Sequence, residues 1–426
     1  MTGSNAKQPQ VKSRRVFYIP GFDPYPPRRY RELYRREGKR QGEISGYEIE
    51  IAPREGPRYG WYVGGRMEEA EVFTEVETLT WSDIVRDTMG ANVAATYFQL
   101  LRVVWVYIAS GTARRLFWLR KGPVLAGFYP VTALLLQLLV AFLAGSLLAV
   151  AVIAAVQGIA ALVTGGTAAQ GAGWQLAMTL AGWAITLPVM YGVLRWFRAR
   201  DGKAYAWYLM HDLAFSTSGN GAYPKALEPR LAEFADAIAE ALAGDADEVL
   251  VVGHSSGAQL AVTVLADLIR AGRVPQGGPV LSLLTLGQAI PMVSFLPKAT
   301  RLRADLHYLS VRDEVTWVDV SAPGDGCSFA LCDPVAVSGV APVGQRWPLV
   351  ISAAFSKTLS PEVWAAMRWR YFKRHFQYLC AFDQPSGYDY FRITAGPLTL
   401  GRRFADRKPS MNRIDVAASR YTDIAA

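Results

Sequence analysis

The sequence predicts an α/β protein whose fold is interrupted by a transmembrane hairpin. Apolar runs of strand length, such as residues 247–252, alternate with segments that have the period of an amphipathic helix, such as residues 227–242. Residues 122–194 contain no Asp, Glu, Lys, Arg or His, and this composition is typical of membrane segments. The chain has 426 residues, which is long enough for one α/β core with this insertion.

The first part of the core is expected at residues 16–90. Residues 1–15 are polar and basic and lack an apolar centre, so we expect a disordered tail there and no secretory signal. Residues 16–24 predict a strand that breaks at Gly21 and enters a proline-rich loop. Three further elements are expected before residue 90: a cation-rich helix at 28–40 and extended segments at 47–53 and 60–80.

The transmembrane hairpin is predicted at residues 122–197. Its two apolar runs, 131–163 and 174–194, are each long enough to span a bilayer core, which needs roughly 20 helical residues. The uncharged link 164–173 joins them, whereas Arg and Lys residues flank both ends. The positive-inside rule therefore predicts that both flanks lie in the cytoplasm. The alternative is a helical hairpin buried in a soluble core.

The main part of the core is expected at residues 198–395. Its predicted elements are helices at 227–242, 258–269 and 302–310 and strands at 247–252, 279–286 and 315–321. Residues 396–426 carry no informative pattern and are expected to form a C-terminal tail.

The candidate chemistry begins at the sequence Gly253-His254-Ser255-Ser256-Gly257, which follows an apolar strand. We expect a strand, a sharp turn and a helix, and a serine at such a turn takes a strained backbone conformation that projects its hydroxyl outward. Gly253 and Gly257 suit this turn, because a Cβ there would collide with the neighbouring strand or helix. His254 is the variable residue and is expected to point away from the Ser255 hydroxyl.

This strand, turn and helix resemble the nucleophile turn of the α/β-hydrolase superfamily. The resemblance implies a mostly parallel sheet flanked by helices, with Ser255 as the nucleophile and the backbone N–H of Ser256 as one oxyanion donor. It also implies a second donor in the loop after strand three of that fold, which would be the N–H of Phe22, following Gly21. The family often has histidine before that glycine, where this chain has Pro20.

The same resemblance implies a catalytic triad in the chain order Ser, Asp, His. The acid of this family lies in a loop after a strand, and Asp325 follows the strand at 315–321. Asp319 within that strand and Asp313 before it remain the alternatives. His375 is the only histidine after these acids, so it is the implied base.

The region 91–121 is the other apolar part of the chain. Residues 91–119 are apolar and aromatic around a lone Arg102 and could form a third span. The Phe22 loop and the Ser255 turn must meet in one active site, however, and this requires an even number of spans between them. We therefore expect an interfacial helix or a lid at 91–121, with its arginines at headgroup level.

Composition restricts the partners and cofactors. The net charge of +9 is compatible with nucleic acid or an anionic membrane surface. The sequence has no nucleic-acid motif, and its aromatic-rich apolar segments favour the lipid bilayer. The three cysteines, Cys327, Cys332 and Cys380, lack metal-ligand spacing and are expected to be reduced thiols in a cytosolic compartment. We predict neither a metal nor another cofactor.

These features together predict a membrane-anchored serine hydrolase that cleaves an ester or thioester. Its catalytic domain is expected on the cytoplasmic side, in a bacterial inner membrane. Confinement beside the bilayer raises the effective concentration of a lipid or acylated substrate, which is the expected substrate class. Two alternatives remain: an acyltransferase that uses the same acyl-enzyme, and a non-catalytic membrane scaffold with the hydrolase fold.

Overall fold

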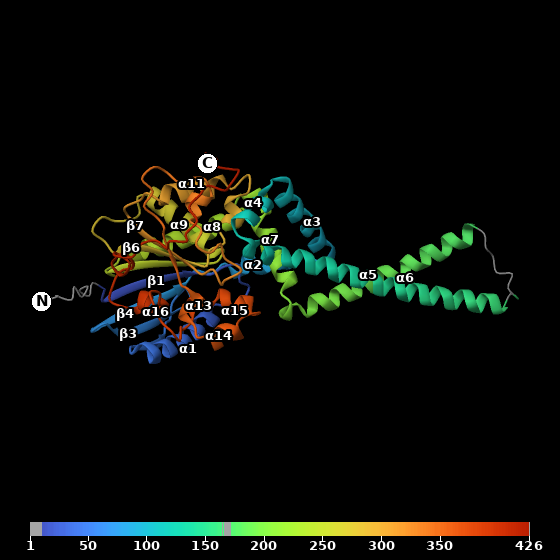
Figure 1. Cartoon of the computed structure of the whole chain (residues 1–426), viewed down its shortest axis with the longest axis horizontal. Coiled ribbons are helices and arrows are strands. Elements are labelled where there is room, and N and C mark those ends of the chain that lie inside the picture. The colour runs from blue at the N-terminus through green and yellow to red at the C-terminus, as the bar shows by residue number, and fades with distance from the viewer. Residues whose placement is uncertain (1–10, 164, 166–171, 426) are drawn as a thin grey trace. The chain divides into compact units, whose positions relative to one another are not determined.

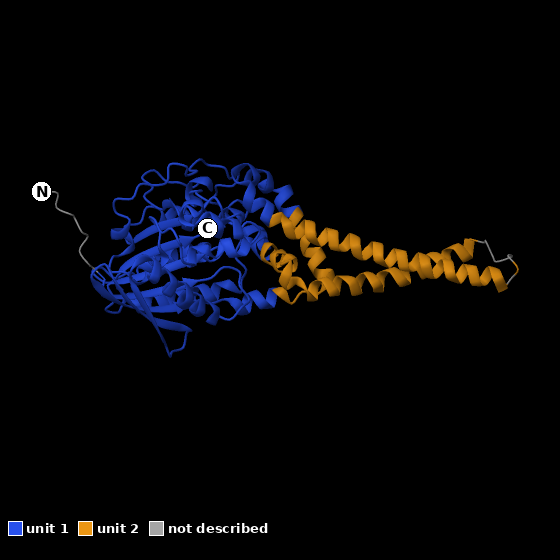
Figure 2. Ribbon diagram, turned by 60° about the horizontal axis from the view of Figure 1, so that its bottom comes forward, with its two compact units in different colours: residues 1–88, 105–126, 215–426 blue, residues 89–104, 127–214 orange. Residues whose placement is uncertain are grey.

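The computed structural model describes residues 11–163, 165 and 172–425 (Figure 1). The chain divides into two compact units (Figure 2). The larger unit comprises the residues up to 88, 105–126 and 215–426, and the smaller unit comprises 89–104 and 127–214. Most of the predicted link 164–173 and residues 1–10 of the predicted N-terminal tail lie outside the described residues.

A single eight-stranded sheet forms the centre of the larger unit. The strands lie in the order β2-β3-β4-β1-β5-β6-β7-β8. β3 is antiparallel to both of its neighbours, and the other neighbouring strands are parallel. The strands are β1 (Ser13–Ile19), β2 (Glu48–Pro53), β3 (Gly60–Met67), β4 (Ala70–Thr78), β5 (Glu248–His254), β6 (Val280–Leu286), β7 (Val315–Ser321) and β8 (Leu349–Ser352). The predicted α/β class, with a mostly parallel sheet, is confirmed.

Helices cover both faces of this sheet, as the burial of every residue of β5 requires. In Figure 1, α8 (Leu227–Leu242), α9 (Gly257–Arg270) and α11 (Thr300–Leu309) lie over one face, and α1 (Arg28–Ser45) lies over the other. The shorter helices of this unit are α10 (Pro291–Ser294), α12 (Pro334–Val337), α13 (Phe355–Thr358), α14 (Pro361–Ala366), α15 (Tyr371–His375), α16 (Tyr390–Ala395) and α17 (Leu400–Arg403), with 3₁₀ turns η2 (Ser218–Gly221) and η3 (Gln377–Leu379).

The expected N-terminal tail is too long, because residues 13–15 belong to β1. Arg14 is fully buried, and its Nε lies 2.6 Å from Glu248 Oε2. Its two terminal nitrogens donate to the carbonyl oxygens of Gly396 and Leu398, each at 2.8 Å. The basic composition of this segment predicted a solvated tail, because the sequence does not reveal that Glu248, Gly396 and Leu398 lie close to Arg14 in the fold.

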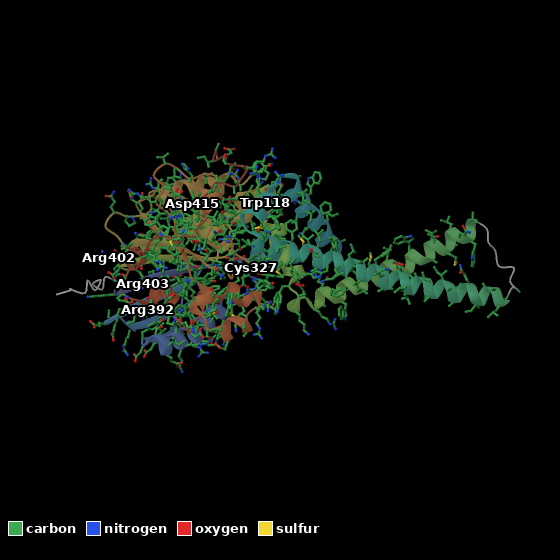
Figure 3. All side chains as sticks on the ribbon, viewed as in Figure 1. Trp118, Cys327, Arg392, Arg402, Arg403 and Asp415 are labelled. Carbon is green, nitrogen blue, oxygen red and sulfur yellow. The ribbon has the colours of Figure 1, made fainter. Side chains whose placement is uncertain are left out.

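The expected C-terminal tail is likewise part of the larger unit. Leu400 in α17 is buried, and its N–H donates to Glu248 Oε1 at 2.7 Å. Farther along, the N–H of Ile414 donates to the carbonyl oxygen of Leu331 at 2.7 Å. Figure 3 shows Arg402, Arg403 and Asp415 on this unit. Residues 396–400 and Phe404 therefore pack on the core, whereas most of the segment 405–425 is exposed and lies on the surface of this unit.

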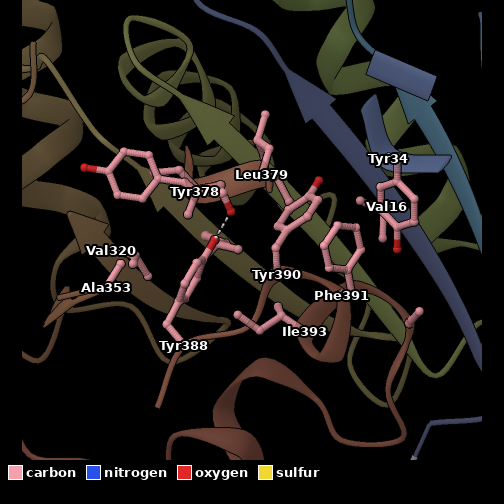
Figure 4. Packing of buried hydrophobic residues seen from close by; sticks show 14 of the residues in the cluster. Val16, Tyr34, Val320, Ala353, Tyr378, Leu379, Tyr388, Tyr390, Phe391 and Ile393 are labelled. Carbon is pink, nitrogen blue, oxygen red and sulfur yellow. Dashed lines mark hydrogen bonds between the residues drawn. The ribbon is translucent and has the colours of Figure 1, made fainter. Parts of the chain in front are cut away.

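A layer of aromatic side chains fills the core between the sheet and the segment after His375 (Figure 4). Tyr34 contacts the rings of Tyr390 and Phe391, with centroids 5.8 and 5.0 Å apart. The Tyr388 hydroxyl donates to the carbonyl oxygen of Tyr378 at 2.8 Å. Buried tyrosines stabilise a core when their hydroxyls find such partners, so this layer fixes the backbone around Tyr378.

The smaller unit holds the predicted hairpin. α5 (Lys121–Val163) and α6 (Ala172–Ala199) are long and apolar enough to cross a membrane. They approach closely at Gly145, where an added Cβ would lie 2.7 Å from the Thr186 carbonyl oxygen. Small residues allow such close packing of membrane helices.

The region 91–121 forms two helices. α3 (Val93–Ala109) and α4 (Thr112–Leu119) are bent by 74° at their junction, so they would make a third span only as one broken helix. The interfacial helix or lid expected there stays a prediction. The other short elements between the sheet strands are α2 (Ser82–Met89), η1 (Asp201–Lys203) and α7 (Ala206–Ser216).

Candidate active site

Ser255 occupies a strained turn between β5 and α9. Its φ is +57°, a left-handed conformation that residues with a Cβ seldom adopt. Its N–H donates to the carbonyl oxygen of Leu286 at 2.9 Å, which ties the turn to the end of β6. The side chain remains partly accessible. Strain at one residue between a parallel strand and a helix is what the Gly-x-Ser-x-Gly pattern predicts for an exposed nucleophile.

Three glycines let the surrounding backbone approach this turn. A Cβ at Gly253 would lie 2.7 Å from Ala258 Cα. A Cβ at Gly257 would lie 2.2 Å from the Ile19 carbonyl oxygen, and one at Gly21 would lie 3.0 Å from Ser255 Cβ. Contacts below 3 Å cannot be relieved when the neighbour is backbone, so Gly253 and Gly257 are required by close packing. The loop after β1 therefore lies directly against Ser255.

Asp325 and His375 form a buried hydrogen-bonded pair. His375 Nδ1 lies 2.8 Å from Asp325 Oδ2, and both side chains are almost fully buried. The same oxygen accepts a hydrogen bond from the Tyr378 hydroxyl at 3.0 Å, and Oδ1 accepts one from the Cys327 N–H at 2.9 Å. Burial alone would raise the pKa of Asp325, but the nearby His375 and the Cys327 N–H outweigh it and hold the pKa below its ordinary value. Asp325 is therefore ionised, accepts a hydrogen bond from Nδ1–H of His375 and fixes the orientation of that ring.

The two alternative acids lie elsewhere. Asp319 is buried within β7, where its Oδ1 accepts a hydrogen bond from Thr285 Oγ1 at 2.6 Å. Burial raises the pKa of Asp319 to about 7. Asp313 is exposed and forms an ion pair with Arg346. Asp325 is thus the one of the three predicted candidates that contacts His375.

The two predicted oxyanion donors are adjacent. The N–H of Phe22 donates to Ser256 Oγ at 2.9 Å. The Phe22 ring packs against Trp81 and Phe215, with centroids 5.8 and 5.6 Å away. The N–H of Ser256 lies at the N-terminus of α9, where the helix dipole favours negative charge. An oxyanion at this position would replace the Ser256 hydroxyl as the acceptor for Phe22.

His254 connects the serine turn to the backbone of His375, a contact that the sequence did not predict. Its Nε2 lies 3.0 Å from the backbone carbonyl oxygen of His375, so Nε2 carries the proton and donates it. Nδ1 then accepts from the Tyr18 hydroxyl at 3.3 Å. Burial, followed by the proximity of His375, lowers the pKa of His254 to about 3, so this histidine is neutral. No local pattern signals the contact, because its partners are distant in the sequence.

Among the described residues, Ser255 and His375 do not share a hydrogen bond, although the His254 and His375 rings lie 4.9 Å apart. Such bonds are often long without substrate and shorten when it binds.

Asp325, Cys327 and His375 also offer ligand atoms within 4.8 Å of one another, a grouping that could hold a metal ion. Both oxygens of Asp325, however, already accept hydrogen bonds.

Comparisons of the chain with protein-family models, curated proteins and solved structures found no match in any of the three.

Proposed function

We propose that the chain is a membrane-anchored serine hydrolase of the α/β-hydrolase type that cleaves an ester or thioester by way of an acyl-enzyme. The observation that carries this proposal is the 2.8 Å contact between His375 Nδ1 and Asp325, next to a serine held at positive φ. Nucleophilic acyl transfer needs a carboxylate that orients an imidazole, and a strained serine whose proton the imidazole can accept.

The first half of the reaction forms the acyl-enzyme. Ser255 Oγ attacks the carbonyl carbon of the substrate while His375 Nε2 accepts the Oγ proton. The negative charge that develops on the carbonyl oxygen is stabilised by the N–H groups of Phe22 and Ser256. The carbon–oxygen or carbon–sulfur bond to the leaving group then breaks, and His375 returns its proton to that alcohol or thiol.

The second half releases the acid. Water attacks the Ser255 ester, His375 accepts a proton from that water, and the bond to Ser255 Oγ breaks as the serine regains its proton. Asp325 stays ionised throughout and stabilises the imidazolium of His375 in both halves. The two apolar helices support a lipid or acylated substrate, because insertion of both into a bilayer would confine the site beside it.

Covalent labelling with a fluorophosphonate probe tests the proposal. The native protein, solubilised in mild detergent, should be labelled at Ser255 as identified by peptide mass spectrometry. Ser255→Ala should lose the label and roughly 10³-fold or more of any esterase rate. Ser386→Ala, at an exposed serine with no role in the proposed site, is the matched control and should keep both the label and the rate. Labelling of Ser255→Ala at another serine would overturn the assignment.

A further inference from the structure

The segment that carries His375 has an unusual surface. Residues 361–375, here called the base-bearing segment, contain α14 and α15. Trp369 is 74% exposed and Tyr371 is 46% exposed. Arg368, Arg370 and Lys373 are exposed between and beside these rings, and no Asp or Glu occurs between Val363 and Phe382. Large aromatic side chains and cations thus alternate on a surface next to the base.

These cations have no acidic partner among the described residues. Arg374 lies over the rings of Trp364 and Tyr371, with its guanidinium carbon 5.7 and 4.8 Å from the centroids. Arg368 lies 5.2 Å from the Trp369 ring centroid. Elsewhere in this unit exposed arginines do pair with carboxylates, as Arg66 does with Glu71 at 2.7 Å. Among the described residues, the four basic side chains of the base-bearing segment therefore form no ion pair, and the segment has one acidic residue, Glu362.

The segment adjoins the start of the first apolar helix. A Cβ at Gly326 would lie 3.5 Å from the Tyr371 ring, and a Cβ at Gly122 would lie 3.5 Å from Gly326 Cα. Gly122 belongs to the first turns of α5, which are part of the larger unit. The base-bearing segment, the loop of Asp325 and the beginning of α5 are thus contiguous. Within the larger unit, the first turn of α5 therefore lies beside the loop that carries Asp325.

A second aromatic and basic surface precedes this point. Trp118 in α4 is 78% exposed, and Arg114 lies in the same helix. Figure 3 shows Trp118 and Cys327 well separated from Arg402 and Arg403 within the larger unit. Exposed tryptophan and tyrosine beside arginine and lysine are typical of protein surfaces at the headgroup level of a bilayer.

We propose that the base-bearing segment binds the anionic headgroups of the bilayer that α5 and α6 enter, and that the site takes its ester from anionic lipids. The first part stands on the exposed rings, the cations without an ion pair and the continuity with α5. The second part rests on the proposed hydrolase function. Anionic lipid attracts each lysine or arginine near the surface with a free energy that corresponds to about a fivefold change in binding.

Hydrogen exchange of the full chain in lipid nanodiscs tests the surface without requiring activity. With phosphatidylglycerol present, the amides of residues 362–375 should exchange more slowly than in phosphatidylcholine alone, by a factor of about five or more. Arg368→Gln combined with Arg370→Gln should remove this difference. Arg402→Gln with Lys408→Gln, which removes the same charge from the C-terminal segment, should retain it. Exchange of the β5 amides shows whether each variant is folded.

Three outcomes would overturn the surface proposal. They are equal exchange in the two lipids, equal slowing in both charge variants, and the same slowing by inorganic phosphate in phosphatidylcholine nanodiscs. The substrate part is tested by acid release from the two lipids, with Ser255→Ala as the blank. Faster acid release from phosphatidylcholine would contradict the proposed preference for anionic lipids alone. Absence of probe labelling at Ser255 would contradict the proposed hydrolase activity without affecting the proposed headgroup binding.

Discussion

Asp325 illustrates how one carboxylate is kept ionised in a buried place. Burial raises the pKa of an acid, as it does for Asp319. Asp325 differs because it accepts hydrogen bonds from His375, Tyr378 and the Cys327 N–H. Two buried aspartates six residues apart therefore have pKa values shifted in opposite directions, and only the ionised one can orient a histidine.

Replacing each candidate acid separates these roles. Asp325→Asn should lower the rate of ester hydrolysis by roughly 10³- to 10⁴-fold, because asparagine favours the wrong tautomer of His375. Asp319→Asn and Asp313→Asn should each retain most of the rate, since neither contacts His375. The measurement is kcat/KM for a soluble activated ester in detergent. An active Asp325→Asn variant beside an inactive Asp319→Asn variant would contradict the assignment.

At the scale of elements, the sequence predicted what local patterns encode. The strands β5, β6 and β7 and the helices α8, α9 and α11 lie where periodicity placed them, within a few residues. The contact between Asp325 and His375 was expected from the resemblance, and the structure brings the two together. What local patterns could not reveal are partners distant in sequence. Arg14 with Glu248 and His254 with the His375 carbonyl are both of this kind.

The link that His254 makes between β5 and α15 should be sensitive to acid. Its pKa falls from 6.5 to about 3 on folding. The unfolded state therefore binds more protons between these values, and stability falls as the pH drops below about 6.5. His254→Gln removes the titration while keeping a donor for the His375 carbonyl.

Unfolding of the detergent-solubilised protein at pH 7 and pH 5 measures this effect. From pH 7 to pH 5, the free energy of unfolding of the native chain should fall by up to about 2 kcal/mol more than that of His254→Gln. This figure follows from about 1.4 kcal/mol per pKa unit. Comparison at pH 7 gives the cost of the substitution itself. Equal pH dependence of the two proteins would mean that folding does not lower the pKa of His254.

At the scale of the whole molecule, strand pairing constrains membrane topology. β1 and β5 are adjacent parallel strands, with Ile19 opposite Gly253. Both α5 and α6 lie between them in the sequence. Strands of one sheet must lie on one side of a membrane, so the chain crosses an even number of times between β1 and β5. If α5 and α6 are both spans, α3 and α4 together cannot form a complete third one.

Cysteine accessibility tests this topology in intact cells. In a variant that lacks the three native cysteines, single cysteines at Glu69, Lys203 and Lys408 should resist an impermeant thiol reagent, because the basic flanks of the hairpin predict a cytoplasmic location. Gly173→Cys, at the exposed start of α6, should react. Two further positions, Gly90 and Lys121, bracket α3 and α4 and should both be protected, because an interfacial helix leaves its two ends on one side. Reaction at Gly90 with protection at Lys121 would make α3 and α4 a true span. Since β1 and β5 pair in one sheet, either α5 or α6 would then have to remain on one side of the membrane.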